Sequence, residues 1–365
     1  MKRIDLTQLK VFPLAERDSM ARIEETLIDP ASEPRPLSPN NQQRVTQCAR
    51  DIRAARERGA SVMYIYGAHL IKNGAHQLLD ALMADGWITH LATNGAGVIH
   101  DWEWAHHGRS TESVRANVAT GTFGTWEETG RCLHLAVLTG ALREEGFGHS
   151  VGRMVAENGF TLPARSELET KLREEPSHAL APARAELLQI MTQHNLADGR
   201  HEIAHPWGAT SVLGNAFRHD VPLTVHPGIG YDIISNHPLF NGAALGRAAG
   251  LDFATFGGSV EGLDNGVVLS VGSAIMGPQV FEKSISCVNN LRLQAGREIV
   301  RGHAIHVVDI QDGGGWDWTQ GEPPKDNPAY YLRFCKSYDR MGGTMHYAQC
   351  DNIDFTHHLL NELAQ

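Results

Sequence analysis

Short apolar runs along this chain alternate with longer segments in which apolar residues recur every three or four positions. Residues 62–66 form a β-favouring run that stops at Gly67, residues 76–82 show helical spacing, and residues 87–93 are typical of a second buried strand. Together these segments predict a βαβ unit. Further strands are predicted over 221–226, 251–256, 267–271 and 304–310, and further helices over 41–58, 125–142, 182–194 and 278–290.

The alternation of strands and helices predicts an α/β fold, with a Rossmann-like, mostly parallel sheet and helices on both faces. Residues 1–44 include four prolines between Pro30 and Pro39 and are predicted to form an arm or linker. Residues 45–365 are predicted to form a single α/β domain of the dinucleotide-binding type.

Composition narrows the classes of partner. The formal net charge of −10 argues against a nucleic-acid partner, for which a clustered basic face is expected. The five cysteines form no C-x-x-C pair, which favours reduced thiols and a cytoplasmic protein. The first residues lack the apolar stretch of a secretion signal, and no apolar run approaches the ~18 residues of a membrane span, so no membrane partner is expected.

Several predicted strands end in glycine, small residues or acids, and open parallel sheets bind their ligands at such carboxyl ends. The clearest case is residues 93–98, Thr-Asn-Gly-Ala-Gly-Val, although no G-x-G-x-x-G with a later acid is present. Bare backbone of this kind admits a phosphate or a ribose, which makes NAD the leading cofactor hypothesis. The residues predicted to contact the cofactor are Asn94, Gly95, Gly97, Gly272, Ser273, Asp309 and Asp312.

Three side chains near these strand ends are candidates for a catalytic proton relay. His226 ends a predicted strand, Asp232 follows in the next loop, and His100 continues the first glycine turn. A side chain at each of these positions could act as a general acid or base. Hydrogen-bonded packing histidines are the alternative.

Two aromatic segments offer walls for a substrate. Trp316, Asp317 and Trp318 lie in the acidic loop after the predicted strand 304–310, and we predict that they contact a small-molecule substrate, with a solvated loop as the alternative. For Trp102 and Trp104 we favour helix packing and an oligomer contact.

Residues 201–205 read His-Glu-Ile-Ala-His, the letters of a zinc-hydrolase motif. The motif works when both histidines lie on one face of a helix. Pro206 follows at once and Gly199 lies just before it, so a continuing helix is not expected. A metal-dependent hydrolase using His201 and His205 is kept as an alternative, and no metal ligands are assigned.

Five segments resemble those of a known enzyme family. Residues 68–74 are similar to its loop before the first binding helix, residues 93–101 to its Thr-Thr-Ala-Gly-Gly-Val-Glu-Glu-Asp stretch, and residues 221–232 to the strand that carries its Thr-Asp-Gly loop. Residues 272–274 are similar to its Gly-Gly-Gly loop, and residues 309–317 to its acidic glycine-rich loop. The family is deoxyhypusine synthase, which uses NAD to move an aminobutyl group from spermidine to a protein lysine. The resemblance implies an NAD pocket and a homotetramer with sites at subunit interfaces.

The sequence departs from this family where the reaction takes place. The family's imine-forming lysine has no counterpart in residues 329–333, where Arg333 cannot serve as an amine nucleophile. His100 replaces one of the family's paired glutamates. We therefore predict an NAD-dependent enzyme that oxidises a small substrate, such as an amine, before elimination or group transfer, and that is not a true deoxyhypusine synthase. A non-catalytic cofactor-binding protein is the remaining alternative.

Overall fold

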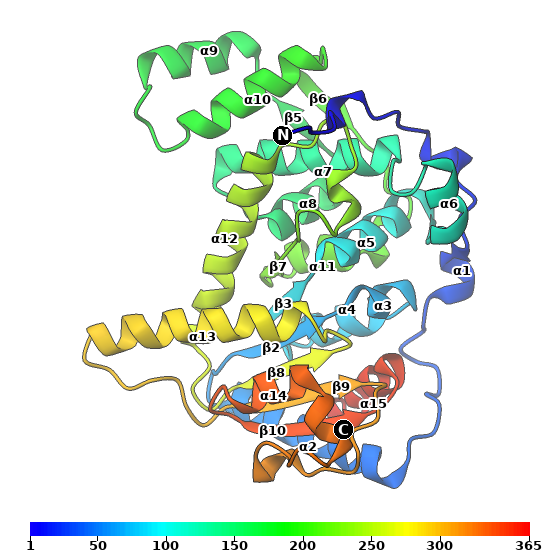
Figure 1. The fold of residues 1–365 in the computed structure, drawn as a ribbon, viewed down its shortest axis with the longest axis vertical. Coiled ribbons are helices and arrows are strands. Elements are labelled where there is room, and N and C mark those ends of the chain that lie inside the picture. The colour runs from blue at the N-terminus through cyan, green and yellow to red at the C-terminus, as the bar shows by residue number, and fades with distance from the viewer.

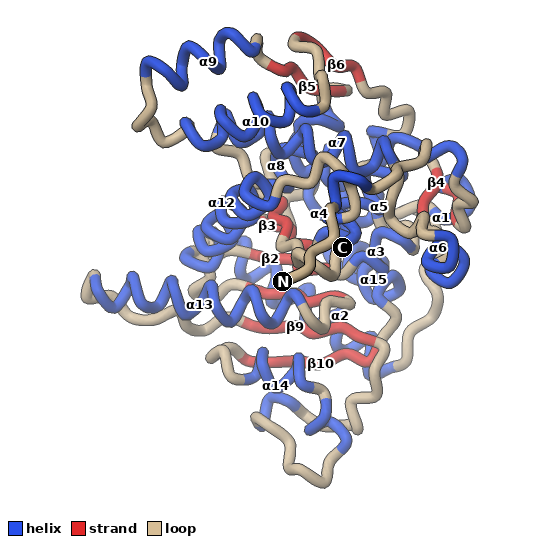
Figure 2. The backbone as a smooth tube through the Cα atoms, turned by 45° about the horizontal axis from the view of Figure 1, so that its top comes forward, coloured by secondary structure: helices blue, strands red, loops and turns tan.

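The computed structural model describes residues 1–365 and is built around one six-stranded sheet (Figures 1 and 2). All five strand pairings are parallel, and the strand order is β10-β9-β8-β2-β3-β7. The predicted α/β class, with a Rossmann-like parallel sheet, is confirmed. The strands are β2 (Val62–Tyr66), β3 (His90–Thr93), β7 (Leu223–Val225), β8 (Val267–Val271), β9 (Ala304–Asp309) and β10 (Thr344–Gln349).

Helices cover both faces of the sheet because successive strand residues point to opposite sides. In β2, Tyr64 packs in the core cluster that includes helix α2, whereas Met63 and Ile65 pack in the cluster on the opposite face. The first face is covered by α2 (Pro39–Glu57), α4 (His76–Ala84) and α15 (Asn352–Leu363), and the second by α12 (Gly242–Glu261), α13 (Met276–Gln294) and α14 (Arg333–Asp339).

The chain order of the strands creates a switch point in the sheet. The chain runs from β2 outward through β3 to β7, then returns to β8 on the other side of β2 and continues outward to β9 and β10. The loops after β2 and β8 therefore leave in opposite directions. In doubly wound sheets this is where a ligand crevice opens.

The long connection between β3 and β7 forms a mainly helical layer at the top of Figure 1. Its Trp102 and Trp104 are at most 1% exposed, which confirms the helix packing predicted for them, whereas the oligomer contact predicted with it stays a prediction. No helix of the protein combines the length and the apolar character needed to cross a membrane. The elements of this layer are α5 (Gly95–His107), β4 (Arg109–Ser110), α6 (Val114–Thr120), α7 (Glu127–Gly140), α8 (Phe147–Ala156), β5 (Gly159–Leu162), α9 (Arg165–Glu174), α10 (Ala181–Gln193), β6 (Gly199–Glu202) and α11 (Val212–Arg218).

The N-terminal segment runs along the outside of the molecule, drawn in dark blue in Figure 1. Its short strand β1 (Ala21–Arg22) pairs antiparallel with β4, and α1 (Ile23–Thr26) follows. Arg17 is only 5% exposed. The segment predicted as an arm thus contributes a buried side chain to the body of the protein.

One predicted strand is wrong, and one strand of the sheet was not predicted. Residues 251–256 belong to α12, where Leu245, Ala248, Asp252, Phe256 and Val260 are buried at helical spacing. The two glycines after residue 256 were interpreted as closing a strand, but they lie within the helix. β10 and α15 were not predicted.

Candidate functional site

A cavity of about 250 Å³ lies at the carboxyl ends of β3 and β7. It is enclosed by α3 (Ala68–Lys72), α5, the N-terminal segment, residues 111–123 and the loop after β7. Two of the three predicted relay residues, His100 and Asp232, line it together. The structure therefore brings together side chains that lie 132 positions apart in the sequence.

A buried chain of hydrogen bonds fixes the tautomer of His100. Ser110 Oγ donates its single proton to Glu103 Oε2 at 2.8 Å and lies 2.7 Å from His100 Nδ1. Because that hydroxyl proton is already used, Nδ1 must be the protonated nitrogen and the donor to Ser110. His100 Nε2 therefore carries a free lone pair, and the ring's hydrogen bond to the protein is made at Nδ1.

Glu103 is held as a carboxylate by Arg17. The two side chains form a bidentate pair at 2.7 and 2.8 Å and are almost fully buried. Thr129 Oγ1 adds a third donor at 3.0 Å. The Arg17 guanidinium helps to keep the pKa of Glu103 below its usual value although burial acts in the opposite direction. The N-terminal segment thus completes the support of His100.

Burial keeps His100 neutral. It lowers the pKa of His100 to about 4, and Lys72 and Arg17 contribute in the same direction, while Glu103 opposes them. Lys72 lines the same cavity, and its amine has no ion-pair or hydrogen-bond partner. Lys72, Glu103 and Arg17 were not predicted as site residues. The only available signal was the acid between two tryptophans, Trp102 and Trp104.

Asp232 occupies the amino end of α5. Its carboxylate accepts hydrogen bonds from Gly228 N at 2.7 Å and from the backbone of Gly95 and Ala96. Asn94 Oδ1 accepts from Gly97 N at 2.9 Å. The first N–H groups of this helix are therefore already satisfied by the protein, and burial raises the pKa of Asp232.

The glycines of this turn are explained by the same contacts. A Cβ on Gly95 would lie 2.7 Å from Asp232 Oδ2, and a Cβ on Gly97 would lie 2.1 Å from Thr93 Oγ1. Side chains of the protein fill the space beside these glycines, where the cofactor was predicted to lie. Cofactor contact by Asn94, Gly95 and Gly97 stays a prediction.

At the switch point the loops after β2 and β8 lie against one another. Gly67 and Gly272 bring the two loops into backbone contact, because a Cβ on Gly67 would lie 2.0 Å from Gly272 O. Beside them, Asn352 Oδ1 is buried without a hydrogen-bond partner. Ser273 Oγ accepts from Gly277 N at 3.1 Å. An unpaired acceptor suits a hydroxyl donor such as that of a ribose, although protein atoms also fill the space beside these two glycines.

The acidic loop after β9 lies two strands further from the cavity, because β8 and β2 separate β9 from β3. Trp318 is 2% exposed and packs in the core, and Trp316 Nε1 donates to Gly321 O. Asp317 caps the turn that follows it by accepting from Thr319 N. Of the predicted cofactor residues, Asp309 accepts from Gln311 N and Asp312 from Gly314 N.

His226 lies on the opposite face of the sheet from α5 and is not part of the cavity. Its Nε2 is 3.1 Å from Thr224 Oγ1, which is 2.9 Å from His90 Nε2. Its ring packs edge-on against Phe256 of α12. The structure thus gives His226 the packing environment that was its alternative interpretation.

The zinc-hydrolase alternative loses its structural basis. His201 lies in strand β6, stacks on Phe160 and has its Nε2 2.8 Å from Ala197 O. His205 follows the strand, with its Nδ1 3.3 Å from Asn158 Oδ1. Gly199 and Pro206 predicted that no helix continues through this segment, and the two histidines indeed do not share a helix face.

Comparisons with known proteins add fold likeness only. No protein-family model matches the chain, and no curated protein matches it. Unliganded AgrE is 15% identical, with a TM-score of 0.47, over 90% of this chain and 34% of AgrE. A conserved putative LOR/SDH protein from Methanococcus maripaludis S2 is 14% identical, with a TM-score of 0.44, over 92% of this chain and 73% of that one. A putative deoxyhypusine synthase from Entamoeba histolytica is 9% identical, with a TM-score of 0.34, over 75% and 80%.

The chain spans about a third of the length of AgrE. AgrE has also been solved as a ternary complex with ornithine and NAD⁺. None of these likenesses is close enough to carry a function to this chain. Membership of the deoxyhypusine synthase family remains a prediction.

Proposed function

We propose that this protein is an NAD-dependent enzyme that oxidises a small polar substrate in the cavity over α5. The observation that carries the proposal is the Glu103–Ser110–His100 hydrogen-bond chain, which leaves the Nε2 lone pair of His100 as a base with no protein partner. A neutral histidine in this tautomer can accept the proton of a substrate amine or hydroxyl group. When bound, NAD⁺ takes up the hydride.

The remaining residues have positioning roles in this proposal. Lys72, which has no ionic partner, would bind an anionic group of the substrate, and Asp232 would hold the amino end of α5 in place. α3 follows β2, so the cavity adjoins one of the two switch-point loops. Gly272, Ser273 and Asn352 would hold the dinucleotide there. Oxidation would make the adjacent substrate carbon labile for elimination or group transfer.

The first test is denaturing release and mass analysis of the small molecules that co-purify with the protein, followed by calorimetric titration with NAD⁺. We expect NAD(H) or saturable NAD⁺ binding. Reduction of NAD⁺ is then followed by absorbance with a panel of amines, amino acids and hydroxy acids. Absence of any NAD binding would overturn the proposal.

His100→Gln separates catalysis from binding. We expect this variant to retain NAD⁺ and to lose roughly 10²–10⁴-fold in turnover, which is the usual contribution of a general base. Ser110→Ala should lower turnover less. NAD⁺ binding without turnover on any substrate would favour the non-catalytic alternative. Turnover that is unchanged in His100→Gln would instead show that His100 is not the base.

A further inference from the structure

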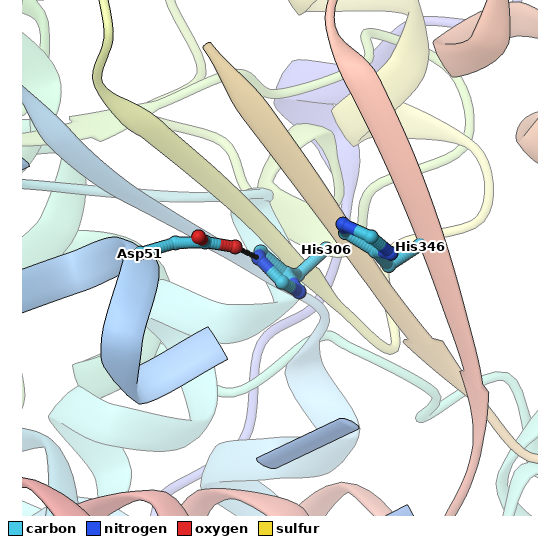
Figure 3. A group of neighbouring side chains, drawn as sticks. All are labelled: Asp51, His306 and His346. Carbon is cyan, nitrogen blue, oxygen red and sulfur yellow. Dashed lines mark hydrogen bonds and ion pairs between the residues drawn. The ribbon is translucent and has the colours of Figure 1, made fainter. Parts of the chain in front are cut away.

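A second polar cluster lies away from the cavity, beneath helix α2. Tyr64, Leu269, His306 and His346 form one row across four neighbouring strands on the same face of the sheet. In this row β2 contributes a tyrosine and β8 a leucine, whereas β9 and β10 each contribute a histidine. Asp51 reaches down from α2 toward them (Figure 3).

The three side chains already approach the spacing of a metal site. One ligand atom from each of Asp51, His306 and His346 lies within 4.8 Å of the other two. His306 Nε2 donates to Asp51 Oδ2 at 2.9 Å. Two ligands of a tetrahedral zinc ion, each ~2.0–2.1 Å from the metal, lie about 3.3 Å apart, so this pair has to open by only a few tenths of an ångström.

Asp51 is oriented as liganding carboxylates usually are. Gln47 Nε2, one turn earlier on α2, donates to Asp51 Oδ1 at 2.9 Å and leaves Oδ2 directed at His306. Such a second hydrogen bond fixes the direction of a carboxylate ligand. The side chain of Asp51 is 24% exposed, so the position is open to solvent.

His346 is the movable member of the cluster. Its ring stacks on that of His306, with centroids 4.9 Å apart and planes at 24°. A metal ion shared by two imidazoles must lie in the plane of both rings, so one ring has to turn. His346 can do so because it is only half-buried, lies on the edge strand β10, and has as its single side-chain hydrogen-bond contact a 3.4 Å approach from Arg44 Nη1.

We propose that Asp51, His306 and His346 bind a divalent transition-metal ion, with zinc as the best match to a two-nitrogen, one-oxygen ligand set. A plain ion pair between Asp51 and His306 would not require the second histidine in register beside it. Binding moves the His306 proton from Nε2 to Nδ1, and the Arg44 guanidinium turns toward solvent. Arg44 Nε has no hydrogen-bond partner, so this movement breaks no hydrogen bond at that atom.

The test uses untagged, chelator-treated full-length protein. Zn²⁺ is titrated by calorimetry and Co²⁺ by its visible absorption. We expect one ion per chain. Binding should weaken by at least about tenfold in His346→Gln and in His306→Gln, because each removes a direct ligand. His358→Gln, at a half-buried histidine on α15, is the matched control and should bind as the wild type does.

Arg44→Ala distinguishes a metal site from a structural ion pair. Removing a positive charge beside His346 should tighten Zn²⁺ binding several-fold, since the guanidinium repels a dication. Circular dichroism checks that each variant is folded, and His346→Gln keeps the test valid if His306→Gln does not fold. No stoichiometric binding, or equal binding in all variants as at adventitious surface sites, would overturn the proposal. Neither result depends on NAD binding at the other site.

Discussion

At the end of β3, His100, Glu103 and Asp232 converge on one cavity, whereas at the end of β9 the carboxylates of Asp312 and Asp317 each turn back onto their own loop. Both regions follow a parallel strand, and both are rich in glycine and acids. They differ in long-range contacts. Glu103 is paired with Arg17, 86 positions away, while Asp312 and Asp317 bond residues two positions along the chain.

This contrast shows what a concentration of acids and glycines does and does not indicate. In the β9 loop the acids stabilise turns, which needs no ligand. Around α5 the acids are buried, and each must be satisfied by groups from distant segments. Buried, long-range polar contacts beside a cavity are therefore the better guide to a site than local composition.

The largest difference between the two regions should appear on replacing Glu103. Glu103→Gln leaves Arg17 buried without its counter-charge, which typically costs about 3–5 kcal/mol. Glu322→Gln, in the exposed loop after β9, should leave the free energy of unfolding unchanged within error, because solvent screens its pairs with Lys336 and Arg340. Urea denaturation measures both variants. A double variant, Arg17→Met with Glu103→Leu, should recover part of the loss; equal small losses in the two single variants would remove the contrast.

The sequence predicted the sheet better than the site. Strands such as β2 and β8 are continuous apolar runs because they are buried on both faces, and that pattern is local. Leu251 and Phe256 misled the prediction because a short apolar run fits a helix as well as a strand. Arg17 could not be predicted as a site residue, since its importance depends on a fold that brings residue 17 against residue 103.

The cavity residues also divide into those that local sequence features predicted and those whose role depends on the tertiary fold. His100 and Asp232 were predicted because both follow strand ends, where the chain turns toward the rim. Lys72 was missed because nothing local separates it from any exposed helix-end lysine. The glycines at 95 and 97 were identified as special positions, but the groups that require them, Asp232 and Thr93, are set by tertiary packing.

A smaller effect is expected on the pH dependence of stability. Burial lowers the pKa of His100 from 6.5 to about 4, so the folded state disfavours its protonation. The contribution of neutral His100 to the free energy of unfolding is fully present above pH 6.5 and is lost as the pH falls toward 4. The loss is on the order of 3 kcal/mol. His100→Gln should reduce the loss of unfolding free energy over this range, as measured by urea denaturation at several pH values. His358→Gln, at a half-buried histidine outside the cavity, is the control. Identical slopes in wild type and His100→Gln would contradict the buried, neutral histidine.

The smallest effect tests whether Lys72 and His100 act on one another across the cavity. The positive charge of Lys72 lowers the pKa of His100, so Lys72→Met should raise it, while Glu103→Gln should lower it further because Glu103 acts in the opposite direction. Long-range proton–nitrogen NMR of the histidine ring follows the titration directly and also reports the tautomer. Lys325→Met, in the loop after β9, should leave the pKa of His100 unchanged, since two strands lie between that loop and the cavity. A shift of equal size in both lysine variants would mean that net charge, and not the geometry of the cavity, controls His100.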